Sequence, residues 1–198
     1  MLDVVMEYAR DVMDSPIVYL VIFAVAMGDA IIPMVPSDAV VVTAGVFAAS
    51  GKPNILLVMV AALLGAIAGD HVSYWIGRAG GGRFARRKGG KTDRIRHLIE
   101  ERGGLVLFVA RYIPGGRTVT TLTMGALRYP QPKFTAFDCL ASAVWAVQWA
   151  LVGYFGGHAF EDDPVKALLL GFGIAAAVTV IAELVRRIRN HTKKTQHA

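Results

Sequence analysis

GDAIIPMVPSDAVVVTAG, residues 28–45, is an apolar stretch that contains two aspartates and two prolines: Asp29, Asp38, Pro33 and Pro36. An ionised side chain in hydrocarbon costs at least about 2.5 kcal/mol, so it is rare there without a partner, a water-filled cavity or a function. Proline lacks the backbone N–H and interrupts a helix. The stretch therefore predicts a broken helical segment whose carboxylates serve a site.

A second broken stretch, FVARYIPGGRTVTTLTMG at residues 108–125, has the opposite charge. Arg111 and Arg117 lie on either side of a Pro-Gly-Gly sequence that begins at Pro114. Both proline and glycine disfavour a continuous helix. Acids in one broken stretch and bases in the other predict a site at which the two stretches meet.

The composition is that of a membrane protein. The chain has 198 residues, of which 55% are hydrophobic, and its mean hydropathy is +0.49. The apolar residues form blocks rather than the periodic stripes of a soluble amphipathic helix. The blocks at 134–155 and 165–185 reach the length of roughly 20 residues that spans a bilayer. We therefore predict an all-α membrane protein.

The net charge of +6 comes mainly from two basic segments. Residues 78–102 contain nine Lys or Arg, and residues 186–194 contain five. Because basic residues beside apolar spans mark cytoplasmic loops, both segments are predicted to lie in the cytoplasm. This placement argues against nucleic-acid binding and predicts contact with anionic lipid head groups at 78–102.

The orientation predicts two hairpins. Residues 104–125 would begin and end on the cytoplasmic face, yet most are too apolar for a loop, so a re-entrant hairpin is expected. Residues 28–45 would form a second hairpin from the outer face, with one tilted helix over 17–36 as the alternative. Two opposed hairpins with about three to four transmembrane helices form an inverted repeat, which is typical of transporters.

Four regions follow from these patterns. Residues 1–15 are predicted to form an amphipathic helix on the membrane surface, with a plain helical cap as the alternative. Residues 16–157 form the membrane domain, 158–185 a further transmembrane helix, and 186–198 a basic cytoplasmic tail. The single Cys139 provides neither a disulfide framework nor a thiolate metal cluster.

The four charged residues of the broken stretches have distinct chemistry. Burial favours the neutral form of a carboxyl group, so Asp29 and Asp38 are candidates for proton coupling. For Asp38 a helix N-cap is the alternative. Arg111 and Arg117 stay charged and present a planar fork that suits a phosphate. The alternative for them is an Arg–Asp ion pair that only braces the hairpins.

The residues between the stretches suggest supporting roles. Asp70 and His71 could serve a proton path, with a merely solvated histidine as the alternative. Tyr74 and Trp75 are expected in an interfacial aromatic belt. Gly65 and Gly69 are spaced for close helix packing. Arg78 is expected to meet lipid head groups, whereas Thr118 either binds a head group or satisfies backbone groups at the break.

Taken together, these motifs resemble the DedA family of membrane proteins, also called the SNARE-associated or VTT-domain family. The matching residues are Asp29–Asp38 with Ala44-Gly45, Gly69-Asp70 with Tyr74 and Gly77-Arg78, Phe108 with Arg111-Tyr112-Ile113-Pro114-Gly115, Arg117-Thr118 with Gly125, and residues 134–145. The resemblance covers roughly residues 15–157. Position 29 departs from the family, in which Glu is more usual, so the charge is kept on a shorter side chain.

The resemblance implies lipid transport, of a polyprenyl phosphate such as undecaprenyl phosphate or of a phospholipid such as phosphatidylethanolamine, often driven by protons. It implies functional roles for residues that match Asp29, Asp38, Arg111 and Arg117. It also implies opposed re-entrant hairpins. The expected supporting residues are Pro33, Pro36, Tyr112, Pro114, Gly115, Thr118, Asp70, Tyr74 and Arg78.

We therefore expect a proton-coupled, flippase-type lipid transporter of the plasma membrane, without cofactor or metal. Its partners would be membrane lipids and protons, and a homo-oligomer is one option. A lipid-modifying enzyme is the first alternative, but the chain lacks the phosphatase and transferase patterns that would support it. A structural or assembly factor with bracing charge pairs is the second.

Overall fold

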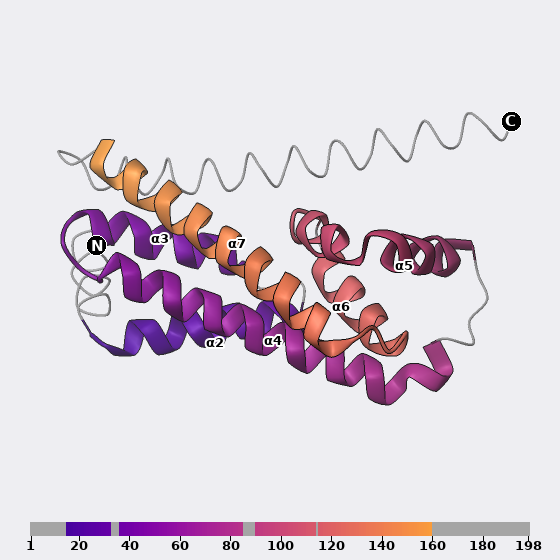
Figure 1. Cartoon of the computed structure of the whole chain (residues 1–198). Coiled ribbons are helices and arrows are strands. Elements are labelled where there is room, and N and C mark those ends of the chain that lie inside the picture. Colours follow the sequence, from indigo (N-terminus) through magenta and orange to yellow (C-terminus); the bar gives the residue numbers. More distant parts are fainter. Residues whose placement is uncertain (1–14, 33–35, 85–89, 114, 160–198) are drawn as a thin grey trace, which may run out of the picture.

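A computed structural model of the chain describes residues 15–32, 36–84, 90–113 and 115–159 (Figure 1). Its regular elements there are α2 (Ile17–Ile31), α3 (Ser37–Ala49), α4 (Ile55–Phe84), α5 (Gly90–Arg111), α6 (Gly116–Ala126) and α7 (Gln131–Ala159). The predicted all-α class is confirmed for this part of the chain. The predicted N-terminal helix, C-terminal span and tail, as well as Pro33 and Pro114, lie outside the described residues.

The first broken stretch forms two helices, α2 and α3, and not one tilted helix. Helix α2 ends at Ile31, and Ile32 has extended backbone with φ −116° and ψ 98°. That conformation is expected of a residue followed by proline. Helix α3 begins after Pro36. The backbone N–H of Asn54 donates to the Tyr19 hydroxyl at 2.9 Å, so the start of α2 lies beside the turn that follows α3. The two helices are therefore antiparallel.

The second broken stretch has the same form. Helix α5 bends at Arg102, which has non-helical φ and ψ, and ends at Arg111. Gly115 has φ +69°, the left-handed region that favours glycine, and α6 follows it. Gly103, just after the bend, lies against the Tyr129 side chain beyond the end of α6. The end of α5 and α6 thus also run antiparallel.

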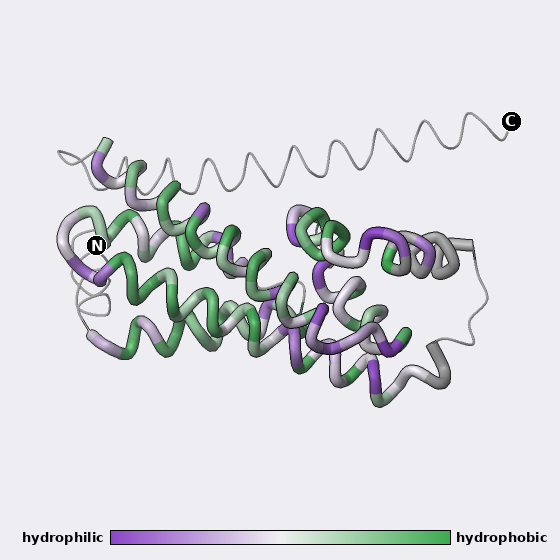
Figure 2. The backbone as a smooth tube through the Cα atoms, viewed as in Figure 1, coloured by the Kyte–Doolittle hydropathy of each residue, from purple (hydrophilic) through white to green (hydrophobic). Residues whose placement is uncertain are grey.

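The long helix α4 connects the two pairs along the chain, and the long helix α7 follows α6 and packs on α3 and α4. Both contain stretches long and apolar enough to span a membrane, Ile55–Gly81 and Gln131–Ala159. In Figure 1, α2 and α3 lie at one end of the molecule and α5 and α6 at the other. Figure 2 shows that the end with α2 and α3 is the more uniformly hydrophobic. The polar segments therefore gather from the middle of the molecule towards α5 and α6.

The helices cross at small residues. On α4, Gly65 lies against the backbone of Phe23 and Gly69 against that of Met27, which confirms the predicted packing role of these glycines. Helix α4 packs against α6, and α7 against α3. At these two crossings the glycines lie against backbone carbonyls: Gly77 against that of Leu122, Gly125 against that of Tyr74, Gly153 against that of Val42 and Gly45 against that of Ala150.

Tyr74 is not in an interfacial belt, so that prediction is wrong. Its side chain is fully buried, stacked on Phe134 with ring centroids 4.6 Å apart. Its hydroxyl donates to the Tyr129 carbonyl at 2.6 Å. The face of α4 that carries Tyr74 packs against other helices, whereas the adjacent Trp75 is 51% exposed.

Candidate functional site

Arg117 lies at the start of α6, where the break in the second stretch aims its side chain at the middle of α4. Its Nε donates to Asp70 Oδ1 at 2.7 Å, and its Nη2 donates to the Ala66 carbonyl at 2.9 Å. Its Nη1 donates to Asp29 Oδ2 at 3.3 Å. All three guanidinium nitrogens are therefore bonded, and one of them joins the second broken stretch to the first.

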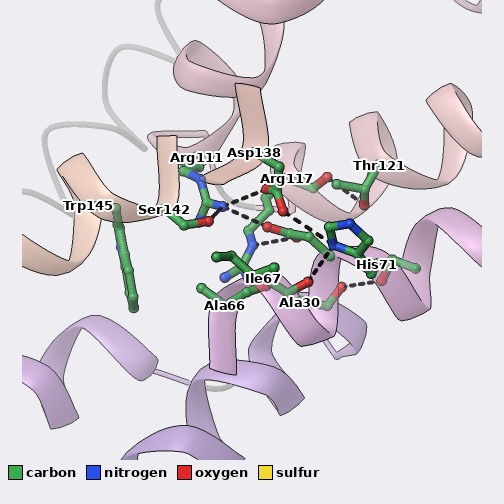
Figure 3. Close-up of polar contacts among 12 residues, drawn as sticks. Ala30, Ala66, Ile67, His71, Arg111, Arg117, Thr121, Asp138, Ser142 and Trp145 are labelled. Atoms are coloured by element: carbon green, nitrogen blue, oxygen red, sulfur yellow. Dashed lines mark hydrogen bonds and ion pairs between the residues drawn. The ribbon is translucent and has the colours of Figure 1, made fainter. Parts of the chain in front are cut away.

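Arg111 is the last residue of α5 and reaches the same carboxylate from the other side. Its Nη2 contacts Asp70 Oδ2 at 2.6 Å, Asp138 Oδ1 at 3.0 Å and the Ser142 hydroxyl (Figure 3). The Arg111 side chain is only 4% exposed. Its Nη1 is buried without a hydrogen-bond partner among the described residues. Arg111 is thus held on one nitrogen and unsatisfied on another.

Asp70 is the centre of this ion cluster, which we define as Asp29, Asp70, Asp138, Arg111 and Arg117. The Asp70 carboxylate is fully buried, and each oxygen accepts from a different arginine. Removing an ion from water costs several kcal/mol, which attraction offsets only where pairing and hydrogen bonding are good. Asp70 meets this condition, because both of its carboxylate oxygens are paired with and hydrogen-bonded to an arginine.

The first broken stretch supplies the outer part of the site. Asp29 Oδ2 accepts from the Ser37 hydroxyl at 2.7 Å as well as from Arg117. Its side chain is 23% exposed, in contrast to the buried Asp70. Asp38 accepts from Trp145 Nε1 at 2.8 Å, a bond that ties α3 to α7. No side-chain cap is formed at the residue before α3.

The VTT domain family matches residues 30–155, a range that includes four of the five residues of the ion cluster. The chain belongs to the DedA family of VTT-domain membrane proteins. It is 26% identical over 182 residues to the protein DedA of Escherichia coli K12, covering 87% of this chain and 83% of that protein.

Two further relatives are named as membrane proteins. An uncharacterized membrane protein of Synechocystis is 29% identical over 168 residues, 81% of this chain and 77% of its own. The inner membrane protein YohD of E. coli K12 is 31% identical over 124 residues, 61% and 65% respectively. No solved structure matches the chain. With the apolar helices α4 and α7, these relatives establish a membrane protein.

The predicted site residues do not all lie in the ion cluster. Asp29, Asp70, Arg111 and Arg117 come together in the ion cluster. Asp38 is bonded instead to Trp145. Three predicted supporting residues make hydrogen bonds outside the ion cluster. Arg78 donates to the Tyr74 hydroxyl at 3.0 Å, and the Tyr112 hydroxyl donates to Gln148 at 2.7 Å.

The predicted backbone residues of the VTT domain shape the breaks. Pro36 precedes α3, and Gly115 precedes α6. Thr118 is buried near the start of α6, and its carbonyl accepts from the Thr121 hydroxyl at 3.1 Å. The hydroxyls of Thr121 and Thr123 both donate to carbonyls of their own helix.

Asp138 and Ser142 of α7 are site residues that the sequence reasoning missed. Asp138 lies in a predicted apolar span, so the cost that singled out Asp29 applies to it equally. His71 joins them: its Nδ1 is 3.6 Å from Asp138 Oδ2. Among the described residues, no group of three or more His, Cys, Asp or Glu is placed to hold a metal ion.

Proposed function

We propose that this protein carries phosphate-bearing lipids across the membrane, with Arg111 and Arg117 as the groups that bind the phosphate. The observation that carries this proposal is the buried Arg111 Nη1, which lacks a partner among the described residues. A phosphate oxygen is the kind of acceptor that a guanidinium prefers. A polyprenyl phosphate and a phospholipid share that group.

The contacts of Arg117 support an exchange in which a lipid phosphate replaces a carboxylate as its partner. Arg117 holds Asp29 at 3.3 Å, and Asp29 is partly exposed, so this ion pair is the weakest of those around Asp70. An arriving phosphate would replace the Asp29 carboxylate on Arg117. Release of Asp29 then allows it to bind a proton, which couples lipid movement to protons. Asp38, beside it on α3, is the second coupling residue in this proposal.

We also propose that the antiparallel helix pairs are re-entrant hairpins of an inverted repeat. The crossed contacts support this, because Gly125 on Tyr74 matches Gly45 on Ala150, and Gly77 on Leu122 matches Gly153 on Val42. The two contact positions on each helix have the same spacing of three in both halves: 74 and 77 on α4 and 122 and 125 on α6, as against 150 and 153 on α7 and 42 and 45 on α3. The basic segment at 78–102 would then face the cytoplasm of a plasma membrane.

A liposome assay tests the proposed function. The full chain is reconstituted with a fluorescent phosphate-bearing lipid, and translocation is read from quenching by a reagent that cannot cross the membrane. Arg117→Ala should reduce translocation to the level of empty liposomes. Lys133→Ala, which removes an exposed positive charge at the start of α7, should translocate like the wild type.

Folding is checked separately by size-exclusion chromatography and circular dichroism. If Arg117→Ala does not fold, Arg117→Lys replaces it, because lysine keeps the charge but loses the planar fork. Translocation at the wild-type rate in a folded Arg117 variant would overturn the phosphate-binding role.

The ion pairs themselves favour a second candidate, an assembly factor in which the charges brace the hairpins. Four Arg–Asp contacts join α2, α4, α5, α6 and α7. A brace predicts that translocation and stability fall together across variants of the ion cluster. Transport predicts that Asp29→Asn loses proton-dependent translocation while the protein keeps most of its stability.

A further inference from the structure

One buried oxygen in the ion cluster is free to accept a proton. Asp138 is fully buried, and its Oδ1 accepts from Arg111 at 3.0 Å. Its Oδ2 is buried without a hydrogen-bond partner among the described residues. Both oxygens of Asp70 are already bonded to arginines. A proton on Asp138 Oδ2 would therefore displace no hydrogen bond of the ion cluster.

The charge balance of the ion cluster also favours one proton. Asp29, Asp70 and Asp138 supply three carboxylates, against the two guanidinium groups of Arg111 and Arg117. A net charge in a poorly hydrated interior is costly. Binding of a single proton to Asp138 removes the excess negative charge. The Arg111 contact with Asp138 then becomes a hydrogen bond to a neutral carboxyl group, and both ion pairs of Asp70 remain.

The His71 ring lies beside the Asp138 carboxylate (Figure 3). Its Nδ1 is 2.8 Å from the Ile67 carbonyl and 3.6 Å from Asp138 Oδ2. Because a carbonyl only accepts, Nδ1 carries a hydrogen in this arrangement. Its Nε2 is 2.9 Å from the Thr135 hydroxyl. The two ring nitrogens therefore face different surroundings.

The Nε2 side leads towards polar surface. Thr135 lies four residues into α7, about 6 Å along the axis from Gln131. The residues before it include Arg128 and Lys133, both exposed. The His71 side chain itself is 22% exposed. Histidine is the side chain best suited to exchange protons near neutral pH.

We propose that His71 is a proton relay between the polar end of α7 and Asp138. Nε2 binds a proton from the polar end, and the ring gives its Nδ1 proton to Asp138 Oδ2. The carboxylate becomes a neutral carboxyl group, and the ring is left neutral with its hydrogen on Nε2. The reverse steps return the proton to the polar end.

The charged and titratable groups that face Asp138 are Asp70 on α4, Arg111 on α5, Arg117 on α6 and Cys139 on α7. Asp29 on α2 and Asp38 on α3 lie near the same two arginines. Each oxygen of Asp70 already accepts from an arginine, whereas Asp138 Oδ2 accepts from none of the described residues, so the relayed proton is placed on Asp138. A coupling role for the relay rests on the proposed function, although proton exchange itself requires no lipid movement.

Infrared spectroscopy of the full chain in phosphatidylcholine nanodiscs tests the relay. The band of the protonated Asp138 carboxyl is identified by its loss in Asp138→Asn and its shift in Asp138→Glu. Its rate of hydrogen–deuterium exchange is then followed after mixing with heavy water. His71→Gln, which can still bond Thr135 but cannot relay a proton, should slow exchange about 10-fold or more.

The control is His97→Gln, which changes an exposed histidine of α5 paired with Glu101 at 3.4 Å. It should exchange at the wild-type rate. Added imidazole should restore exchange in His71→Gln, which a purely structural role of His71 does not predict. If His71→Gln does not fold, His71→Asn is measured in its place.

Two results would overturn the relay: a wild-type exchange rate in the folded His71 variant, or no carboxyl band that depends on Asp138. Failure of the proposed function looks different. A wild-type protein that translocates no lipid but shows exchange dependent on His71 would leave the relay intact.

Discussion

Asp70 and Asp29 contact the same guanidinium but in different surroundings. Asp70 is fully buried and bonds two arginines, at 2.6 and 2.7 Å. Asp29 is 23% exposed and bonds Arg117 at 3.3 Å. Burial determines how much stability is lost when one partner of an ion pair is removed, because no water replaces the partner of a buried charge.

Neutralising these two aspartates should therefore have unequal effects on stability. Asp70→Asn should lower the free energy of unfolding by about 3–5 kcal/mol, since it leaves two buried guanidinium groups underpaired. Asp29→Asn should lower it by about 1 kcal/mol or less. Unfolding in detergent, titrated with sodium dodecyl sulfate and followed by tryptophan fluorescence, measures both. Equal losses would contradict the central position of Asp70.

For single residues, the sequence identified the charged residues of the site better than it identified their ion-pair partners. Arg111, Arg117 and Asp29 stood out because an ion is costly in apolar sequence. Arg111 pairs with Asp70 and Asp138, which are 41 and 27 residues away. Nothing local in the sequence specifies such pairs, because they depend on which helices pack together.

At the scale of the helices, close crossings fix the position of the ion cluster. A side chain at Gly77 of α4 would meet the backbone of Leu122 on α6, whereas one at Gly80 would meet nothing within 4 Å. Helix α6 carries Arg117, so its distance from α4 sets the reach of that guanidinium to Asp70.

Gly77→Val should therefore destabilise the protein by about 1–3 kcal/mol, the usual cost of overpacking. Gly80→Val is the matched control on the same helix, with the same change in helix propensity and no collision. Thermal unfolding in detergent, followed by circular dichroism, compares the two. A loss in Gly80→Val as large as that in Gly77→Val would show that propensity and not contact with α6 is responsible.

The breaks between helices were predictable, but the buried faces were less so. Proline and the Pro-Gly-Gly sequence marked both breaks, because their backbone limits act locally. Tyr74 was assigned to the wrong surroundings, since an aromatic residue in an apolar span suits both an interfacial belt and a core, and α4 continues beyond Tyr74 to Phe84. Its stacking on Phe134 of α7 decides between them.

For the whole molecule, the important feature is that the second helix of each broken stretch packs on the long helix of the other half. Helix α3 packs on α7, and α6 packs on α4. The order of the helices along the chain was predictable from apolar blocks and breaks. The crossed pairing was not, because it depends on small residues that meet only in three dimensions.

The most direct test of the proposed site is photo-crosslinking with a phosphate-bearing lipid whose reactive group lies next to the phosphate. The protein is labelled in nanodiscs and the modified peptides are read by mass spectrometry. We predict labels on peptides that flank the two breaks, near Asp29 and between Arg111 and Arg117, and their loss in Arg117→Ala but not in Lys133→Ala. Labels confined to the exposed outer faces of α4 and α7, and unchanged in Arg117→Ala, would contradict the account.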